Sequence, residues 1–152
     1  MDITTIVDVI RNTQDCVVFS PQGLPVVNDS HVLTEELEQF YAICGGMDLF
    51  VGSAFPTRIS RPEQFVLANP VILANVLAEE HERTDKSWSW YIVAYGDNSQ
   101  YISVDLAGEG AGLYYNSFWI KHPGNSEVIS QSLVDLLQKL LSTKGEYYWF
   151  DD

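Results

Sequence analysis

Apolar and polar residues alternate along residues 88–106, WSWYIVAYGDNSQYISVDL, and this alternation predicts two β-strands joined by a tight turn. One face of the first strand carries Trp88, Trp90, Ile92 and Ala94. One face of the second strand carries Ile102, Val104 and Leu106. The Gly-Asp-Asn-Ser sequence at 96–99 tolerates turn dihedrals, so the segment predicts a β-hairpin. We expect Trp90, Ile102 and Val104 to build the core.

Further strands are predicted on both sides of this hairpin. Residues 113–120 follow a glycine-rich connection and read as a third consecutive strand, which gives an antiparallel meander. Shorter strands are predicted at 16–19, at 49–51 and near 58–60.

Two N-terminal segments show helical spacing of apolar residues. The first stripe is Ile3, Ile6, Val7 and Ile10, and the second is Leu37, Phe40, Tyr41 and Cys44. Thr34 is the predicted N-cap of the second helix, and Gly45-Gly46 is predicted to end it because glycine adopts the left-handed backbone conformation that closes a helix.

The C-terminal third predicts a long helix that is capped by Ser126 and ended by Gly145. Its apolar face is Ile129, Leu133, Leu136, Leu137, Leu140 and Leu141. Residues 70–78 fit either a helix or a strand, and Asn69-Pro70 as a helix start favours the helix. We expect the aromatic run at 147–150 to pack back onto the domain.

These segments together predict an α+β fold: a mainly antiparallel sheet with a central meander, flanked by helices, and a long C-terminal helix. The chain has 152 residues and no long linker, so we expect one domain over residues 1–152. Hydrophobic residues make up 46% of it, which is enough for a packed core.

The charge narrows the range of partners. Eight Lys and Arg residues against 21 Asp and Glu residues give a formal net charge of -13. Nucleic acids and anionic membranes are polyanions, so we expect neither as a ligand and favour a basic protein partner. The alternative is that the acidity only keeps the protein soluble. The N-terminus lacks the basic and apolar regions of a secretory signal, so the cytoplasm is the expected location.

Motifs for catalysis, metals and cofactors are missing from the sequence. His31, His81 and His122 are far apart, and Cys16 and Cys44 form no CxxC pair, so no metal site is predicted. The glycines at 108, 110 and 112 are followed by a strand-like segment instead of a helix, so a turn is favoured over a nucleotide-binding loop. We therefore predict no enzyme and no cofactor.

An ordered set of short motifs resembles the SUKH superfamily. The set begins with Glu38-Gln-Phe-Tyr-Ala-Ile-Cys-Gly-Gly46 and Ile59-x-x-Pro62-x-x-Phe65, continues with Trp90, Tyr101-Ile-Ser-Val-Asp-Leu106 and Gly112-x-Tyr114, and ends with Val128-Ile-Ser-Gln-Ser-Leu133 and Tyr148-Trp149. The resemblance spans residues 37–149, and the end of the Phe-Tyr helix at Gly-Gly and the Ile-Ser-Val-Asp-Leu strand carry most of it.

The resemblance implies a non-catalytic α+β domain that binds and neutralises a cognate bacterial toxin. Many such toxins act on nucleic acid and carry a basic active-site surface, so a basic nuclease-type toxin is the favoured partner of an acidic chain. Two other functions stay open: a regulatory or scaffolding adaptor, as in fungal cell-wall-synthesis regulators of this superfamily, and a small-molecule binder with a cleft lined by Trp and Tyr. The oligomeric state and the identity of the toxin do not follow from the sequence.

The candidate partner-binding residues are acidic positions expected at the surface. Four of them are concentrated before the hairpin, Glu79, Glu80, Glu82 and Asp85, with a solvated helix face as the alternative. Asp97 in the hairpin turn and Glu109 in the glycine-rich connection follow. Asp105 lies within a predicted strand, where a structural hydrogen bond and a binding role are equally compatible with the sequence.

Overall fold

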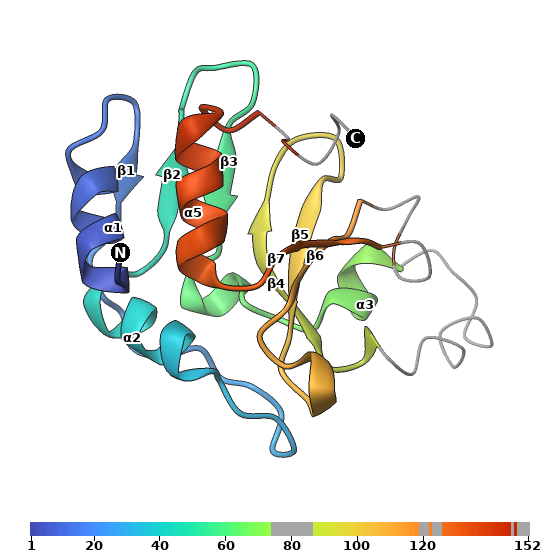
Figure 1. Cartoon of the computed structure of the whole chain (residues 1–152). Helices are drawn as coiled ribbons and strands as arrows, with labels where there is room; N and C mark the ends of the chain where they lie inside the picture. Colours follow the sequence, from blue (N-terminus) through green and yellow to red (C-terminus); the bar gives the residue numbers. More distant parts are fainter. Residues whose placement is uncertain (74–86, 119–121, 123–125, 147, 149–152) are drawn as a thin grey trace.

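A computed structural model describes residues 1–73, 87–118, 122, 126–146 and 148 of the chain (Figure 1). Within these residues one seven-stranded antiparallel sheet follows the sequence order from β1 to β7. Its strands are β1 (Val17–Val18), β2 (Met47–Leu49), β3 (Thr57–Ile59), β4 (Trp90–Tyr95), β5 (Tyr101–Asp105), β6 (Tyr114–Asn116) and β7 (Val128–Ser130). Each strand pairs with the next one along the chain, which confirms the predicted meander and extends it over the whole sheet.

The central hairpin is confirmed, but the predicted common face of Trp90, Ile92 and Ala94 is wrong: a β-bulge turns Ala94 into the main core, whereas Trp90 and Ile92 face the other side of the sheet. β4 and β5 pair antiparallel from Trp90 opposite Asp105 to Tyr95 opposite Tyr101, with a bulge between Ile92 and Ala94. β6 pairs with β5 as the third strand and covers Tyr114–Asn116; positions 113, 117 and 118 of the predicted strand lie outside β6, and positions 119–120 lie outside the described residues.

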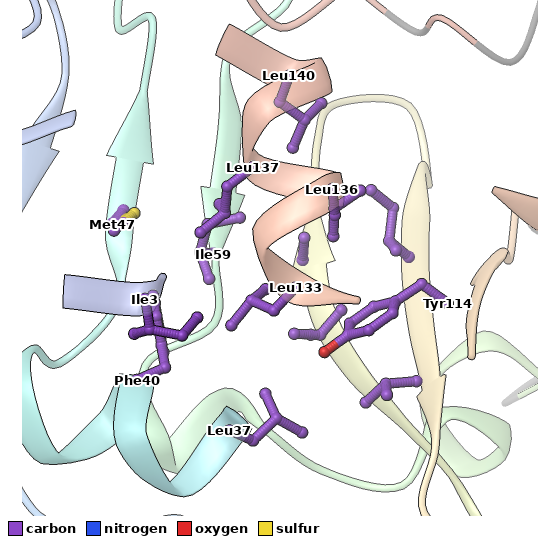
Figure 2. Close-up of a cluster of buried hydrophobic side chains, with 14 of the residues drawn as sticks. Ile3, Leu37, Phe40, Met47, Ile59, Tyr114, Leu133, Leu136, Leu137 and Leu140 are labelled. Atoms are coloured by element: carbon purple, nitrogen blue, oxygen red, sulfur yellow. The ribbon is translucent and has the colours of Figure 1, made fainter. Parts of the chain in front are cut away.

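Three helices pack on one face of the sheet and enclose the main core: α1 (Ile3–Arg11), α2 (Glu35–Ile43) and α5 (Leu133–Ser142). Figure 2 shows Leu133, Leu136 and Leu137 of α5 directed toward the strands, with Leu37 of α2 and Tyr114 of β6 in the same cluster. The predicted apolar stripes of α1 and α2 are buried here. This arrangement confirms the α+β class with a C-terminal helix.

A shorter helix, α3 (Ala68–Ile72), lies on the opposite face of the sheet. Ala68 forms a second apolar cluster with Trp90 and Ile92, separate from the main core. The expectation that Trp90 shares a core with Ile102 and Val104 is therefore wrong. Trp90 pairs with Asp105 whereas Tyr91 pairs with Val104, so Trp90 points to the face that carries α3.

The predicted start of α2 is confirmed, and the helix ends just before Gly45-Gly46, but it is ended by an extended Cys44 and not by a glycine in the left-handed conformation. The hydroxyl of Thr34 accepts the backbone N–H of Leu37 at 3.2 Å, which is the predicted N-cap. Cys44 follows the helix in an extended conformation, and Gly46 has φ +102°. A Cβ at Gly46 would lie 2.8 Å from the carbonyl oxygen of Ile59, so glycine is needed there both for the backbone conformation and for the contact with β3.

The predicted start of the C-terminal helix is wrong. Ile129 lies in β7, and the N-cap is Ser132, not Ser126; the Ser132 hydroxyl accepts the N–H of Asp135 at 3.0 Å. Ile129 and Leu133 are spaced as on a helix, so the sequence pattern fits both conformations. The pairing of β7 with β6 decides for the strand.

Two other predicted boundaries change. Asn69 lies inside α3 and does not cap it, because its side chain is engaged in a buried polar cluster. β2 begins at Met47, directly after Gly46, and ends at Leu49, so residues 50–51 belong to the following turn. The predicted helix over 70–78 falls partly outside the described residues.

A membrane-spanning helix is not found in the described part of this fold. None of the helices in this part of the chain combines the length and the apolar composition needed to span a bilayer.

Candidate protein-binding surface

Asp97 and Glu109 lie at opposite ends of β5. Asp97 is exposed in the turn that enters the strand, and Glu109 is exposed in the 3-10 helix Gly108–Gly110 that follows it. β5 spans five residues, about 17 Å of extended chain, so the two residues are separated by the length of this strand. Glu79, Glu80, Glu82 and Asp85 lie outside the described residues.

Asp105 has a structural role. It is only 7% exposed, and its Oδ1 accepts the hydroxyl of Ser89 at 2.6 Å and the N–H of Ala107 at 3.0 Å. These bonds tie the chain before β4 to the turn after β5. Of the two roles that the sequence left open, the structural hydrogen bond is the observed one.

The glycine-rich connection packs against the same carboxylate. A Cβ at Gly110 would lie 2.7 Å from Oδ2 of Asp105, so a side chain at this position would collide with it. Burial and the nearby Asp105 carboxylate also raise the pKa of the Tyr115 hydroxyl. The predicted turn is therefore confirmed, and its Gly110 lies against the Asp105 carboxylate.

A row of side chains crosses the face of the sheet that points away from α1, α2 and α5. The strand register places them opposite one another on successive strands: Val17, Asp48, Arg58, Tyr95 and Tyr101. Their neighbours in β2, β3 and β5 point the other way into the main core, for example Met47, Ile59 and Ile102. Val17 is 48% exposed, and the other four are partly exposed. We call this row the open face.

Contacts between side chains hold the middle of the open face in place. The guanidinium of Arg58 lies 5.7 Å from the ring centroid of Tyr95 and 3.8 Å from Oδ1 of Asp97. The Tyr95 hydroxyl accepts a hydrogen bond from Nε2 of Gln64 at 2.9 Å. Asp97 therefore belongs to the open face.

A small hollow adjoins the open face at the β2–β3 hairpin. Its volume is about 140 Å³, and its lining includes Asp48, Arg58, Val51 and Pro56. This space accommodates one side chain of a partner, and the Asp48 carboxylate contributes a negative charge to its wall.

A shallow apolar groove lies elsewhere, between the loop before α2 and the chain around α3. Its volume is about 420 Å³, and its lining residues are Val26, Asn28, Val66, Leu67, Pro70, Val71 and Tyr91. Val26 is 90% exposed. The Tyr91 hydroxyl accepts the N–H of Asn28 at 3.0 Å and lies 2.7 Å from Nδ1 of His31, which fixes the loop over the sheet.

Comparison with curated proteins identifies a full-length relative. The chain is 37% identical over 155 aligned residues to the immunity protein YokJ of Bacillus subtilis (strain 168), and the alignment covers 100% of this chain and 91% of YokJ. The chain belongs to the YokJ family. No known protein-family profile matches it, and no solved structure matches it.

This member of the YokJ family contains a buried polar cluster built around His122. Nε2 of His122 lies 2.6 Å from Oδ1 of Asn69, and Nδ1 lies 3.0 Å from the Ser117 hydroxyl. The amide of Asn69 also donates to Ser87 at 2.9 Å. Serine, histidine and asparagine are residue types of catalytic triads, but these three are buried and satisfy one another. The cluster joins α3 to the ends of β4 and β6.

Burial controls the protonation of this cluster and of the cysteines. It lowers the pKa of His122 to about 4, so the imidazole is neutral at pH 7. Burial raises the pKa of the Cys44 thiol, and both cysteines are free. Among the residues that the structure describes, no group of three or more His, Cys, Asp or Glu side chains could hold a metal ion.

The open face and the groove were not predicted as surfaces in this YokJ-family chain. Arg58 and Tyr95 were placed on strands by the sequence, but only the strand register aligns them with Val17 and Asp48. One pattern in the sequence could have indicated the open face. β2 and β3 each carry one charged residue between two core residues, and this pattern is typical of a strand with one solvated face.

Proposed function

We propose that this protein is a non-enzymatic immunity protein of the SUKH superfamily, one domain over residues 1–152, that binds and neutralises a cognate bacterial toxin in the cytoplasm. The observation that carries the proposal is the full-length identity of 37% to the immunity protein YokJ. The ordered SUKH-like motifs of the sequence also support it. Gly46 ends the connection from α2 to β2, and the Ile-Ser-Val-Asp part of the Ile-Ser-Val-Asp-Leu segment lies in β5.

We propose a basic, nuclease-type toxin as the partner and exclude nucleic acid as a direct ligand. The net charge of -13 supports this choice. An acidic protein is attracted to a basic active-site surface, and covering that surface blocks access to a nucleic-acid substrate. The candidate contact residues are Glu79, Glu80, Glu82, Asp85, Asp97 and Glu109. Asp97 and Glu109 lie at opposite ends of β5, so they would contact different parts of a partner.

A binding role, as opposed to a catalytic one, agrees with the burial and mutual hydrogen bonding of the polar side chains. Asn69, Ser117 and His122 are buried within one hydrogen-bonded cluster, where a substrate cannot reach them. Asp105 is likewise committed to holding a turn. These groups stabilise the sheet that presents the exposed residues.

Co-expression with the protein encoded by the neighbouring gene tests the proposed function. We expect this protein to rescue growth and to copurify with the toxin in a stoichiometric complex. Absence of both effects would contradict an immunity role. Binding to a housekeeping protein without any protection would indicate an adaptor instead.

The dependence of association on salt tests the basic character of the partner. Attraction between an acidic protein and a basic toxin is screened at high ionic strength, so the association rate constant should fall steeply as salt is added. A rate constant that does not respond to ionic strength would rule out electrostatic steering. The triple variant Glu79→Lys, Glu80→Lys, Glu82→Lys should weaken binding without unfolding the protein, and unchanged affinity would show that these residues are only solvated surface.

A further inference from the structure

We propose that the toxin docks on the open face of the sheet and places a Lys or Arg side chain in the hollow beside Asp48. This inference rests on the proposed function and specifies its surface. Among the described elements, α3 covers only the half of this face around Trp90 and Ile92. The other half, from β1 to the start of β5, carries the open face.

The composition of the open face suits protein recognition. Tyrosine and arginine are enriched at the energetic centres of protein interfaces, and Arg58 and Tyr95 lie at the middle of the row with Tyr101 beside them. Val17 adds an apolar contact at the edge strand, where it is 48% exposed. A partner can therefore bury apolar and aromatic area here together with charge.

The charges of the open face select a basic partner. Arg58 is compensated by Asp97, whose Oδ1 lies 3.8 Å from the guanidinium. Within the described part of the chain, the carboxylate of Asp48 forms no ion pair. Asp48 and Arg58 both line the hollow of about 140 Å³. Because Arg58 is paired with Asp97, a cationic side chain that enters the hollow meets the carboxylate of Asp48, which has no ion-pair partner in the described part of the chain.

The open face is also pre-organised. Gln64 donates to the Tyr95 hydroxyl at 2.9 Å, and its own Oε1 accepts the N–H of Arg61 at 3.0 Å. The Tyr95 ring in turn supports the guanidinium of Arg58 at 5.7 Å. Side chains that are already fixed lose little conformational entropy when a partner binds.

The apolar groove is the competing surface on the same molecule. It has an exposed valine at its edge, but no residue that lines it is charged. A groove without charge offers no complementarity to a basic toxin, whereas the carboxylate of Asp48 does. The observations therefore favour the open face, and the groove becomes an outcome of the test.

Binding to the product of the neighbouring toxin gene, measured as Kd and as protection from growth inhibition, tests the inference with single charge reversals. Asp48→Lys on the open face should raise Kd by about tenfold or more, because it puts a cation at the position of a cation-binding carboxylate. Glu38→Lys is the matched control, since it makes the same change in charge at an exposed position on α2, across the sheet from the open face. We expect it to raise Kd by less than about threefold, through the long-range field alone.

A charge swap distinguishes the effect of the charges at these positions on toxin binding from the effect of the net charge of the protein. The double variant Arg58→Asp with Asp97→Arg keeps the net charge and the local pair but reverses its direction, and it should weaken binding if the toxin contacts these residues. Two results together would overturn the inference in favour of the groove: wild-type binding by both Asp48→Lys and the charge swap, and loss of binding by Val26→Asp. The immunity function would then still stand. Failure of the wild-type protein to bind or protect would instead refute the proposed function.

Discussion

The carboxylate of Glu36 in α2 caps the first turn of α5 at Leu133. Its Oε1 accepts the N–H of Leu133 at 2.6 Å, and its Oε2 accepts the N–H of Val134 at 3.1 Å. Ser132 satisfies the N–H of Asp135, the next one along the chain, at 3.0 Å. The N-terminus of α5 is thus supplied with acceptors from two sources, one of them 97 residues away in the sequence.

Replacing Glu36 by Ala should lower the free energy of unfolding by about 1–2 kcal/mol, because two backbone donors lose a charged acceptor near the positive end of the helix dipole. Urea denaturation monitored by circular dichroism measures the change. Glu35→Ala is the control: Glu35 is exposed in the same turn of α2, and its removal should change stability by less than about 0.5 kcal/mol. Equal effects of the two variants would show that the cap contributes no stability.

The contact between Asp105 and Gly110 predicts coupling between the two positions. Gly110→Ala should destabilise the fold by about 1–3 kcal/mol, since the added methyl group would lie only 2.7 Å from Oδ2 of Asp105. In the background Asp105→Ala the collision is absent, so Gly110→Ala should then have a much smaller effect. A double-mutant cycle of urea unfolding measures this difference. Strictly additive effects would contradict the proposed packing of the turn.

Because the hydroxyl of Tyr114 is buried, we expect its removal to have little effect on stability. Tyr114 is 1% exposed, and no described residue forms a hydrogen bond with its hydroxyl. Burial, with the nearby Glu36 carboxylate, raises the pKa of this phenol well above its usual value. Tyr114→Phe should therefore leave the free energy of unfolding unchanged or raise it by up to about 1 kcal/mol. A loss of more than about 1 kcal/mol would indicate a hydrogen bond at this hydroxyl.

His122 predicts that the fold loses stability between pH 6.5 and pH 4. The imidazole has an ordinary pKa of 6.5 in the unfolded chain and a pKa of about 4 in the folded protein, because burial disfavours the charged form. In this window the unfolded state binds a proton that the folded state does not, so stability falls as the pH is lowered, by about 3 kcal/mol in all. Above pH 6.5 the contribution of His122 is complete.

Two measurements test the behaviour of His122. Its ring proton resonances in NMR spectra should not titrate between pH 7 and pH 5. Urea unfolding of the wild-type protein and of His122→Gln should converge as the pH falls from 7 to 4.5, because only the wild type loses stability through this residue. An imidazole that titrates near 6.5 would refute the buried, neutral state.

Local sequence patterns determined much of this fold because they report on the nearest neighbours in the chain. Alternation over 88–106 predicts the β4–β5 hairpin, and helical spacing predicts α1 and α2 together with the Thr34 cap. The start of α5 was misplaced because Ile129 continues the same spacing. A strand of three residues is too short to leave a period of its own.

Net charge and motif order pointed to a partner-binding protein, but not to a surface. Asp97 and Glu109 were grouped by charge and by their place in turns. The length of β5 separates them, and this follows only from the strand pairing.

The sequence by itself therefore determined the elements, the acidic character and the family-like motif order. Only the tertiary structure decided which side chains meet. Glu36 accepts hydrogen bonds from the N-terminus of α5, 97 residues away, and Asp48 lies opposite Arg58 on the neighbouring strand; no local pattern links either pair. Both arrangements arise because sheet register and helix packing are set by the burial of the whole core, which acts across the full length of the chain.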